Sequence, residues 1–285
     1  MRLVTLDSRE VGGRPAVSLP SGEILDLTAA GATLGTSQWR PQSVVSVLAQ
    51  GEEGAAHVAR LVAEIEAASG PQRLQWRAAG RLLPGAGTEL MTPLRRPGLL
   101  LMVRREAGGA LAAYVKNPNA AVGPDARIVL PANRDEPLDG LAMPGLVLGR
   151  PLYAATAEQA ARAIAAVTLV ADLGFSAWSH LDPAGRQFPG ACVIGPCIAT
   201  LDEWPDRVVP GAALTVNSHT IGSRMPDLSL QDAAGILAHL SASYAFRPGD
   251  IVALSSGVGQ FRIGRGDRVS VVLDRSLELH FSVSA

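Results

Sequence analysis

The strongest fold signal in the chain is the stretch Tyr-Val-Lys-Asn-Pro-Asn-Ala-Ala-Val-Gly-Pro at residues 114–124. A short apolar run ends at Lys116, and the proline two residues later marks a turn. Gly123 and Pro124 mark a second turn, after which residues 127–130 are apolar enough to form another strand. The pattern therefore predicts two strands separated by turns, with one ionisable side chain at the end of the first.

A second informative stretch follows at residues 139–149, Asp-Gly-Leu-Ala-Met-Pro-Gly-Leu-Val-Leu-Gly. Together the two stretches resemble the core signature of the fumarylacetoacetate hydrolase superfamily. In that family the second stretch is a strand of the pattern D-Y-E-x-E-L-A-V-V-I-G, whose two glutamates bind a metal ion. In this chain Leu141 and Met143 stand at the two glutamate positions.

The resemblance continues toward the C-terminus. Residues 171–179 match the family pattern N-D-V-S-A-R-D-W-Q and keep its aspartate as Asp172. Residues 185–196 match G-K-S-F-D-T-F-x-P-L-G-P, with Arg186 in place of the lysine. Residues 254–259 match a shortened form of the loop T-G-T-P-x-G-V-G. The resemblance thus covers nearly the whole chain, and it keeps the scaffold glycines and prolines better than the chemical residues.

The resemblance implies an α+β fold that is mainly β, a fumarylacetoacetate-hydrolase-like mixed β-sandwich roll with a small N-terminal α+β domain. We place that small domain at residues 1–80, a linker rich in glycine and proline at 81–97, and the catalytic-type domain at 98–285. Within the first domain, residues 1–27 favour short strands, and apolar spacing over 44–65 favours helix.

Capping residues predict two helices in the main domain. Thr156 and Gln159 form a capping box ahead of an alanine-rich helix expected over residues 160–171. Ser229 gives a similar start signal for a helix over residues 233–243. The rest of this domain consists of short apolar runs bounded by Gly, Pro and Asn, which favours strands.

Composition narrows the class of protein. The chain has 285 residues, 47% of them hydrophobic, and a formal net charge of -1. It lacks the basic field that nucleic acid requires, so we predict no nucleic-acid partner. No stretch is apolar for long enough to span a bilayer, and the N-terminus is not a signal peptide. Cys192 and Cys197 fit neither a disulfide framework nor a zinc site, so we expect a cytoplasmic protein with no membrane partner.

The resemblance also bears on cofactors. In the family, two glutamates and an aspartate hold Mg²⁺ or a similar hard cation, which needs several oxygen ligands. Of that set Asp172 remains, so we predict that the Mg/Mn site is absent and that the chain uses no cofactor. The family H-x-x-E pair activates a water, but the segment between Val103 and Lys116 contains no histidine, so the general base of hydrolysis is also missing.

Five residues remain as candidates for a site. We predict Lys116 and Asp172 as catalytic residues and Arg186, Ser255 and Ser256 as substrate-binding residues. Each also has a structural interpretation. Lys116 could form an ion pair with Asp172 or Glu106, Arg186 could pair at the surface, and the two serines could cap backbone groups in a turn.

Two functional hypotheses follow. The first is a divergent, metal-independent enzyme acting on a small anionic 2-oxo acid or β-dicarbonyl compound by C–C bond hydrolysis, decarboxylation or isomerisation through an enolate. The second is a non-catalytic ligand-binding protein or the inactive partner subunit of an active homologue. The resemblance implies a homodimer, and the second hypothesis adds a heteromer with a homologue.

Overall fold

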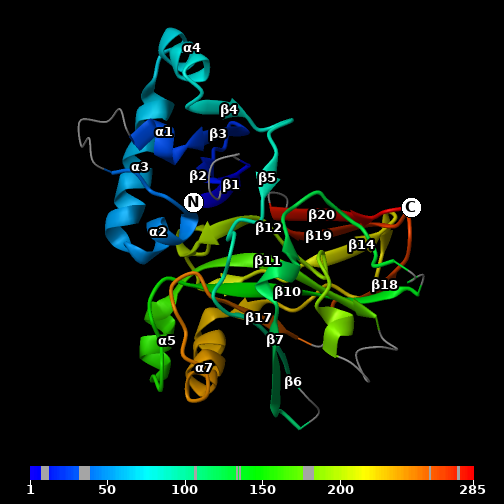
Figure 1. Cartoon of the computed structure of the whole chain (residues 1–285). Helices are drawn as coiled ribbons and strands as arrows, with labels where there is room; N and C mark the ends of the chain where they lie inside the picture. Colours follow the sequence, from blue (N-terminus) through cyan, green and yellow to red (C-terminus); the bar gives the residue numbers. More distant parts are fainter. Residues whose placement is uncertain are drawn as a thin grey trace.

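One long mixed sheet organises the protein (Figure 1). The computed structural model describes residues 1–7, 13–31, 39–105, 108–132, 134, 136–175, 183–256, 258–274 and 277–285. Among these residues a 13-stranded sheet is accompanied by a five-stranded and a two-stranded sheet. Antiparallel and parallel strand pairs both occur. The prediction of a mainly β fold with mixed sheets is therefore confirmed.

The N-terminal part combines strands with a helical layer at the upper left of Figure 1. Its elements are β1 (Arg2–Leu6), β2 (Arg14–Ser18), β3 (Glu23–Asp26), α1 (Leu27–Gly31), α2 (Val44–Ala49), α3 (Glu52–Ala67), α4 (Gly70–Ala78), β4 (Leu82–Pro84) and β5 (Leu90–Met91). Gly51 separates α2 from α3 with φ of +58°. At Gly54 a Cβ would lie 2.3 Å from the Val47 carbonyl oxygen, so only glycine lets α3 approach α2 this closely.

The predicted boundary between the two domains stays a prediction. The stretch at 81–97 contains β4 and β5, which pair with β3 and β1. Strand β1 in turn pairs with β12 (Cys192–Thr200) of the main sheet. The N-terminal strands therefore extend the main sheet through continuous hydrogen bonding.

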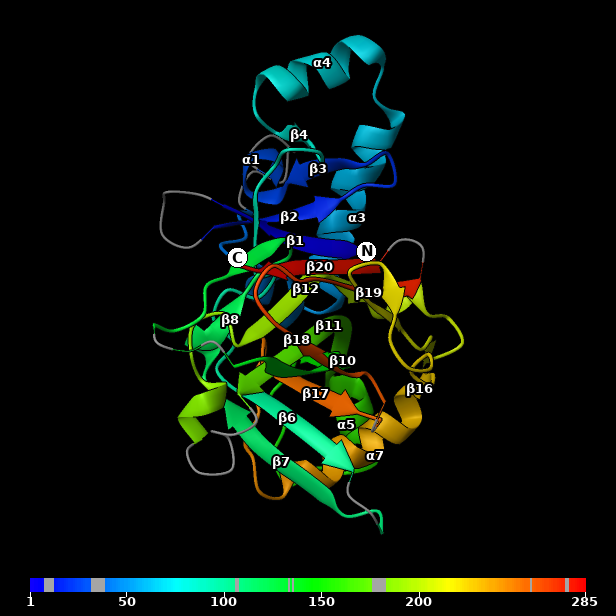
Figure 2. The same cartoon turned by 90° about the vertical axis from the view of Figure 1, so that its right-hand side faces the viewer.

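Figure 2 shows the main sheet as a stack of strands from β7 at the bottom to β4 at the top. The hydrogen-bonded order is β4-β3-β2-β1-β12-β11-β10-β17-β6-β7. The remaining members are β6 (Leu100–Arg105), β7 (Leu111–Lys116), β8 (Ala121–Val122), β10 (Leu138–Leu148), β11 (Ile164–Phe175), β17 (Ile251–Ser255) and β18 (Gln260–Ile263). Pro144 lies between the half of β10 that pairs with β18 and the half that pairs with β17.

The sheet curls strongly, as contacts between a side chain of β7 and strand β11 show. Strands β10, β17 and β6 lie between these two in the hydrogen-bonded order. In a flat sheet four strand spacings would separate β7 from β11 by about 19 Å. The Nζ atom of Lys116 on β7 nevertheless lies 3.0 Å from the carbonyl oxygen of Leu173 on β11. After β7 the chain passes through η1 (Pro118–Ala120) to β8, which pairs with β12, so the strands form a roll.

Two apolar clusters cover the two faces of the rolled sheet. One joins the sheet to helices α5 (Ala157–Ala163) and α7 (Leu230–Ser241), which lie side by side below it in Figure 1, and to the five-stranded sheet. That sheet consists of β9 (Ala126–Ile128), β14 (Ala213–Val216), β15 (His219–Thr220), β19 (Arg268–Asp274) and β20 (Leu277–Val283). The two-stranded sheet is β13 (Val208–Val209) with β16 (Leu228–Ser229). The other cluster joins the opposite face to α2 and α3 and surrounds the candidate site.

The helix predicted over residues 160–171 is largely wrong. Thr156 and Gln159 do form the capping box, but α5 ends at Ala163, and residues 164–171 belong to β11. Strand β11 pairs with β10 on one side and β12 on the other, and this central position overrides the helix preference of its alanines. The helix after Ser229 is confirmed as α7. Within the described ranges, no helix is both long enough and apolar enough to span a membrane.

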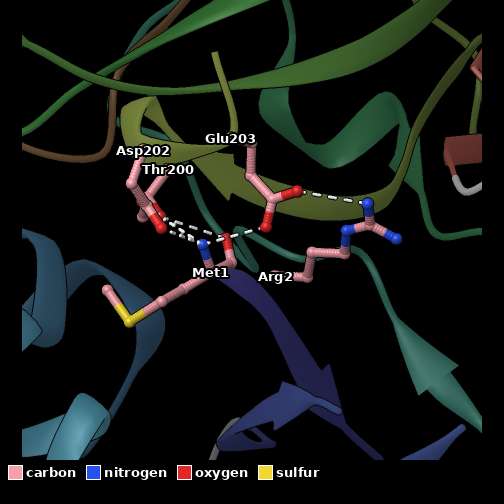
Figure 3. Close-up of polar contacts among 5 residues, drawn as sticks. All are labelled: Met1, Arg2, Thr200, Asp202 and Glu203. Atoms are coloured by element: carbon pink, nitrogen blue, oxygen red, sulfur yellow. Dashed lines mark hydrogen bonds and ion pairs between the residues drawn. The ribbon is translucent and has the colours of Figure 1, made fainter. Parts of the chain in front are cut away.

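A cluster of charges fixes the start of β1 against the main sheet (Figure 3). The α-ammonium group of Met1 lies 2.7 Å from the Thr200 hydroxyl, 2.8 Å from an Asp202 oxygen and 3.1 Å from a Glu203 oxygen. Arg2 adds an ion pair to Glu203 at 3.1 Å. Asp202 and Glu203 lie on η3 (Leu201–Glu203), directly after β12. The cluster therefore reinforces the pairing of β1 with β12.

This cluster predicts a pH-dependent contribution to stability. Burial works to raise the pKa of Asp202, but hydrogen bonds from the Met1 ammonium and the Thr200 hydroxyl hold that pKa below its usual value. A lowered folded-state pKa contributes stability above the unfolded pKa, near 4, and loses it as the pH falls through the folded value. Asp202→Asn should cost about 1 kcal/mol at pH 7, or roughly 2–4 °C in Tm by calorimetry. The difference from the parent chain should shrink below about pH 4, and a difference unchanged across pH would contradict this assignment.

Candidate functional site

The candidate site centres on an ion pair inside the roll. The Nζ atom of Lys116 lies 2.5 Å from Oδ1 of Asp172, and the lysine and aspartate side chains are 0% and 1% exposed. Lys116 is the last residue of β7, and its side chain also donates to the Leu173 carbonyl oxygen at 3.0 Å. Of the sequence-based alternatives for the lysine, pairing with Asp172 is confirmed. Glu106, the other partner considered, lies outside the described residues.

Two further side chains bond to the second oxygen of Asp172. The Tyr114 hydroxyl donates to Oδ2, and Nη1 of Arg186 donates to the same oxygen at 3.1 Å. Arg186 ends η2 (Pro183–Arg186), and its side chain is 26% exposed. The structure thus brings together three of the predicted site residues, Lys116, Asp172 and Arg186, and adds Tyr114.

Tyr114 is not among the site residues predicted from the sequence, although the sequence contains a signal for it. Tyr114 precedes Lys116 by two residues on the same strand, and residues two apart on a strand share one face. Any strand that presents Lys116 to the inside of the roll must present the side chain at 114 there too. Val115, between them, is 48% exposed on the outer face.

The electrostatics of the site favour a neutral phenol beside a carboxylate and two cations. Burial raises the pKa of Tyr114 well above its usual value, and the negative charge of Asp172 raises it further, with Arg186 acting in the opposite direction. The Tyr114 hydroxyl therefore stays protonated and donates a hydrogen bond to Asp172. The formal charges of Lys116, Arg186 and Asp172 sum to +1, so the site carries an excess of positive charge.

Cys192 lies opposite Asp172 in the pairing of β12 with β11, and it is fully buried. Burial raises the pKa of its thiol to about 12; Lys116 lowers that pKa and Asp172 raises it. The thiol is therefore neutral at physiological pH. Because the thiolate is the nucleophilic form, Cys192 acts here as a small packing residue.

Hydrocarbon and thioether groups fill the positions that hold glutamates in the family pattern. Leu141 lies opposite Asp172 in the pairing of β10 with β11, and Met143 lies two residues further along β10. Both side chains are buried in the apolar cluster that includes Met102 and Val170. No group of three or more His, Cys, Asp or Glu side chains suited to a metal occurs within the described part of the chain.

The donor set does not fit a hard divalent cation. Both oxygens of Asp172 already accept hydrogen bonds from Lys116, Tyr114 and Arg186, and two cations beside the carboxylate oppose a third. Glu136, a carboxylate shortly before β10, is 46% exposed and pairs with Arg134 at 3.2 Å. It offers no replacement ligand inside the roll.

The two predicted substrate-binding serines lie at the end of β17. Ser255 is its last residue, half-buried and opposite Arg104 of β6. Ser256 is exposed, and its hydroxyl accepts a hydrogen bond from the Val258 amide at 3.4 Å, which matches the turn-capping interpretation. Gly257, which follows in the same loop, is outside the described ranges. The role of both serines in binding stays a prediction.

Comparison with known proteins identifies the family. The family model for the fumarylacetoacetate (FAA) hydrolase C-terminal domain matches residues 102–283, which contain every member of the Asp172 cluster. The chain belongs to the fumarylacetoacetate hydrolase family. The family resemblance inferred from the sequence motifs is confirmed.

The chain is similar to individual proteins in sequence and in structure. Protein Rv2993c of Mycobacterium tuberculosis is 26% identical over 209 residues, which cover 68% of this chain and 78% of that protein. A 5-carboxymethyl-2-hydroxymuconate delta-isomerase from Mycobacterium smegmatis is 26% identical, with a TM-score of 0.61 over 72% of this chain and 83% of its own.

Maleylpyruvate hydrolase from Sphingobium sp. SYK-6 is 24% identical with a TM-score of 0.69, over 100% of this chain and 99% of its own. That protein has also been solved in complex with manganese(II) ion and pyruvate. At this identity the likeness shows the fold alone. The solved relatives include hydrolases and isomerases, so the family fold carries more than one reaction type.

The buried charges make a prediction about stability. Asp172→Asn leaves Lys116 and Arg186 without a counter-charge and should lower the free energy of unfolding by about 3–5 kcal/mol in chemical denaturation. Adding Lys116→Met to that variant should recover part of the loss, since it removes the buried cation.

An exposed ion pair provides the matched control. Arg162 and Glu158 on α5 lie 2.6 Å apart but are 56% and 78% exposed. Arg162→Met should therefore cost no more than about 0.5 kcal/mol. A loss for Asp172→Asn as small as that of the control would mean that the ion pair is not buried as described.

Proposed function

We propose that this chain is a metal-independent enzyme acting on a small anionic 2-oxo acid or β-dicarbonyl compound through an enolate. Membership in a family whose solved relatives include hydrolases and isomerases supports enzymatic activity. The observation that carries the proposal is the Asp172 cluster. One carboxylate lies among two cations and a phenol, inside a roll whose metal-ligand positions are apolar.

Substrate binding would use the excess positive charge. Arg186 and Tyr114 are the partly exposed members of the cluster. Of these, the planar guanidinium of Arg186 matches a carboxylate with two parallel hydrogen bonds. With the carboxylate on Arg186, the adjacent oxo group would lie toward Lys116 and Tyr114. Both can donate a hydrogen bond to a carbonyl oxygen.

Binding of the substrate carboxylate to Arg186 would also prepare Asp172 to act as the base. Asp172 accepts hydrogen bonds from three side chains in this arrangement, so both of its oxygens are occupied. When the substrate binds Arg186 and Tyr114, the carboxylate loses these two donors and one of its oxygens becomes free to accept a proton. Asp172 then accepts a proton from the carbon next to the oxo group, and the electron pair moves onto the oxo oxygen as an enolate.

Lys116 would stabilise that enolate, because a preorganised cation in a water-poor site is most effective where charge develops. Isomerisation is completed when Asp172 returns the proton to a different carbon. Decarboxylation of a β-keto acid instead breaks the C–C bond to the carboxylate, releases CO₂ and leaves an enolate, which takes up a proton from solvent. Neither route needs an activated water, whereas C–C bond hydrolysis does. The cluster therefore supports isomerisation and decarboxylation more directly than C–C bond hydrolysis. We also propose that the protein is cytoplasmic.

A second candidate function rests on the burial of the ion pair. Because Lys116 and Asp172 are 0% and 1% exposed and bond to each other, they also suit a purely structural pair. In that case the chain would be a non-catalytic ligand-binding member, or the inactive partner subunit of a homologue. A homodimer is the assembly proposed for the catalytic function, and a heteromer for the inactive one.

Metal content tests the first part of the proposal. We expect elemental analysis of the purified protein to find no stoichiometric Mg²⁺, Mn²⁺ or Ca²⁺, because one carboxylate cannot replace three against the hydration of a hard ion. Turnover should be unchanged after treatment with EDTA. One divalent ion per chain, lost from the Asp172→Asn variant, would contradict metal independence.

Activity tests the second part. A panel of acylpyruvates, oxaloacetate and β-keto acids should contain a substrate for which Arg186→Met raises KM by about tenfold or more, because a charge-assisted carboxylate contact is lost. Tyr114→Phe should lower kcat by roughly tenfold to a hundredfold through loss of an enolate donor.

Arg162→Met is again the control and should leave both constants unchanged. If the whole panel gives neither turnover nor binding and the protein co-purifies with a homologue that has both metal-site glutamates, the partner-subunit function replaces the enzymatic one.

A further inference from the structure

Gly174 leaves room for the side chain that caps the Asp172 cluster. It follows Asp172 by two residues on β11, so the two positions share the face that points into the roll. A Cβ atom at Gly174 would lie 2.3 Å from Cγ of Arg186 and 3.2 Å from both its Cζ and its Nε. The aliphatic part of Arg186 therefore rests directly on the Gly174 backbone.

This contact fixes the direction of the guanidinium. Cγ is the second carbon of the side chain, so it moves away only if Arg186 changes its χ1 rotamer, and that change would move the whole side chain. In the observed rotamer Nη1 lies 3.1 Å from Oδ2 of Asp172. Arg186 can therefore reach Asp172 in this rotamer only because position 174 has no side chain.

The next residue anchors the same segment on the opposite side. The Gln187 amide oxygen accepts from the Asn117 backbone at 2.6 Å, and its amide nitrogen donates to the Val115 carbonyl at 3.3 Å. These two backbone groups flank Lys116. The segment carrying Arg186 is therefore held to β7 by Gln187 and lies against β11 at Gly174.

We propose that Gly174 is a positioning residue that holds Arg186 against Asp172 and thereby determines the preference of the site for carboxylate ligands. This inference rests on the proposed function only for the identity of the ligand. With its stem held on a backbone, the guanidinium presents its fork in one orientation, and less side-chain entropy is lost when a carboxylate binds. Any side chain at 174 would push Arg186 away and leave Asp172 with Lys116 and Tyr114.

A double-mutant cycle on stability tests the positioning role without a ligand. Gly174→Ala should lower the urea midpoint of the otherwise unchanged protein, because the methyl group displaces Arg186. In an Arg186→Ala background the same substitution should have a clearly smaller effect, because Cγ is gone. Effects of alanine on strand β11 itself are common to both backgrounds and cancel. If Gly174→Ala does not fold alone but folds together with Arg186→Ala, the proposal is equally supported.

A binding cycle then tests ligand selectivity, with pyruvate as the probe in calorimetric titration. Gly174→Ala should weaken binding by about tenfold or more, as Arg186→Ala does, and the double variant should bind no more weakly than Arg186→Ala alone. Pyruvamide, which lacks the carboxylate charge, should bind all four proteins with the same low affinity.

The outcomes separate the two claims. If Gly174→Ala lowers the urea midpoint equally in both backgrounds, the positioning role of Gly174 is overturned, regardless of the result with pyruvate. Coupling in the stability cycle with no pyruvate binding by any variant overturns the carboxylate preference and argues against the proposed function, while the contact between Gly174 and Arg186 stands. Coupling in both cycles supports the whole inference.

Discussion

The rest of the site depends on the pairing of the buried Asp172 carboxylate with its hydrogen-bond and ion-pair partners. A carboxylate inside an apolar roll must be paired or hydrogen-bonded, because an isolated buried charge is very costly. Two partners come from β7, which lies four strands away from β11 in the order of the sheet, and the third comes from η2, outside the sheet. The curl of the sheet brings Lys116 and Tyr114 to Asp172, and their bonds to the carboxylate in turn hold β7 against β11.

The interior of the roll combines apolar side chains at positions 141 and 143 with a charged cluster around Asp172. Leu141 and Met143 pack against other apolar side chains of the same face, and Lys116 and Arg186 provide positive charge next to Asp172. A cation held by the protein can stabilise a developing enolate, as a bound ion would, provided that the substrate can reach it. Arg186 and Tyr114 are the partly exposed members of the cluster, and Gly174 lies against the first of them.

Sequence patterns predicted the scaffold better than the site. Turn signals around Lys116 and capping signals at Thr156 and Ser229 are local, and the structure contains those features where they were expected. The predicted helix over 160–171 failed because β11 is fixed by its neighbours β10 and β12, which no local signal encodes. Pairing of Lys116 with Asp172 could be inferred from the family motifs, whereas the packing of Arg186 on Gly174 depends on backbone distances that a sequence does not contain.

We propose that the Asp172 cluster binds an oxo acid through protein cations rather than through a metal. The most direct measurement is a crystal structure of the protein with oxamate, an unreactive analogue of pyruvate, in the presence of EDTA. We expect the oxamate carboxylate on Arg186 and its amide carbonyl facing Lys116 and Tyr114, with Leu141 and Met143 still packed together. Oxamate bound elsewhere, or bound at Asp172 only when a divalent cation is supplied, would contradict it.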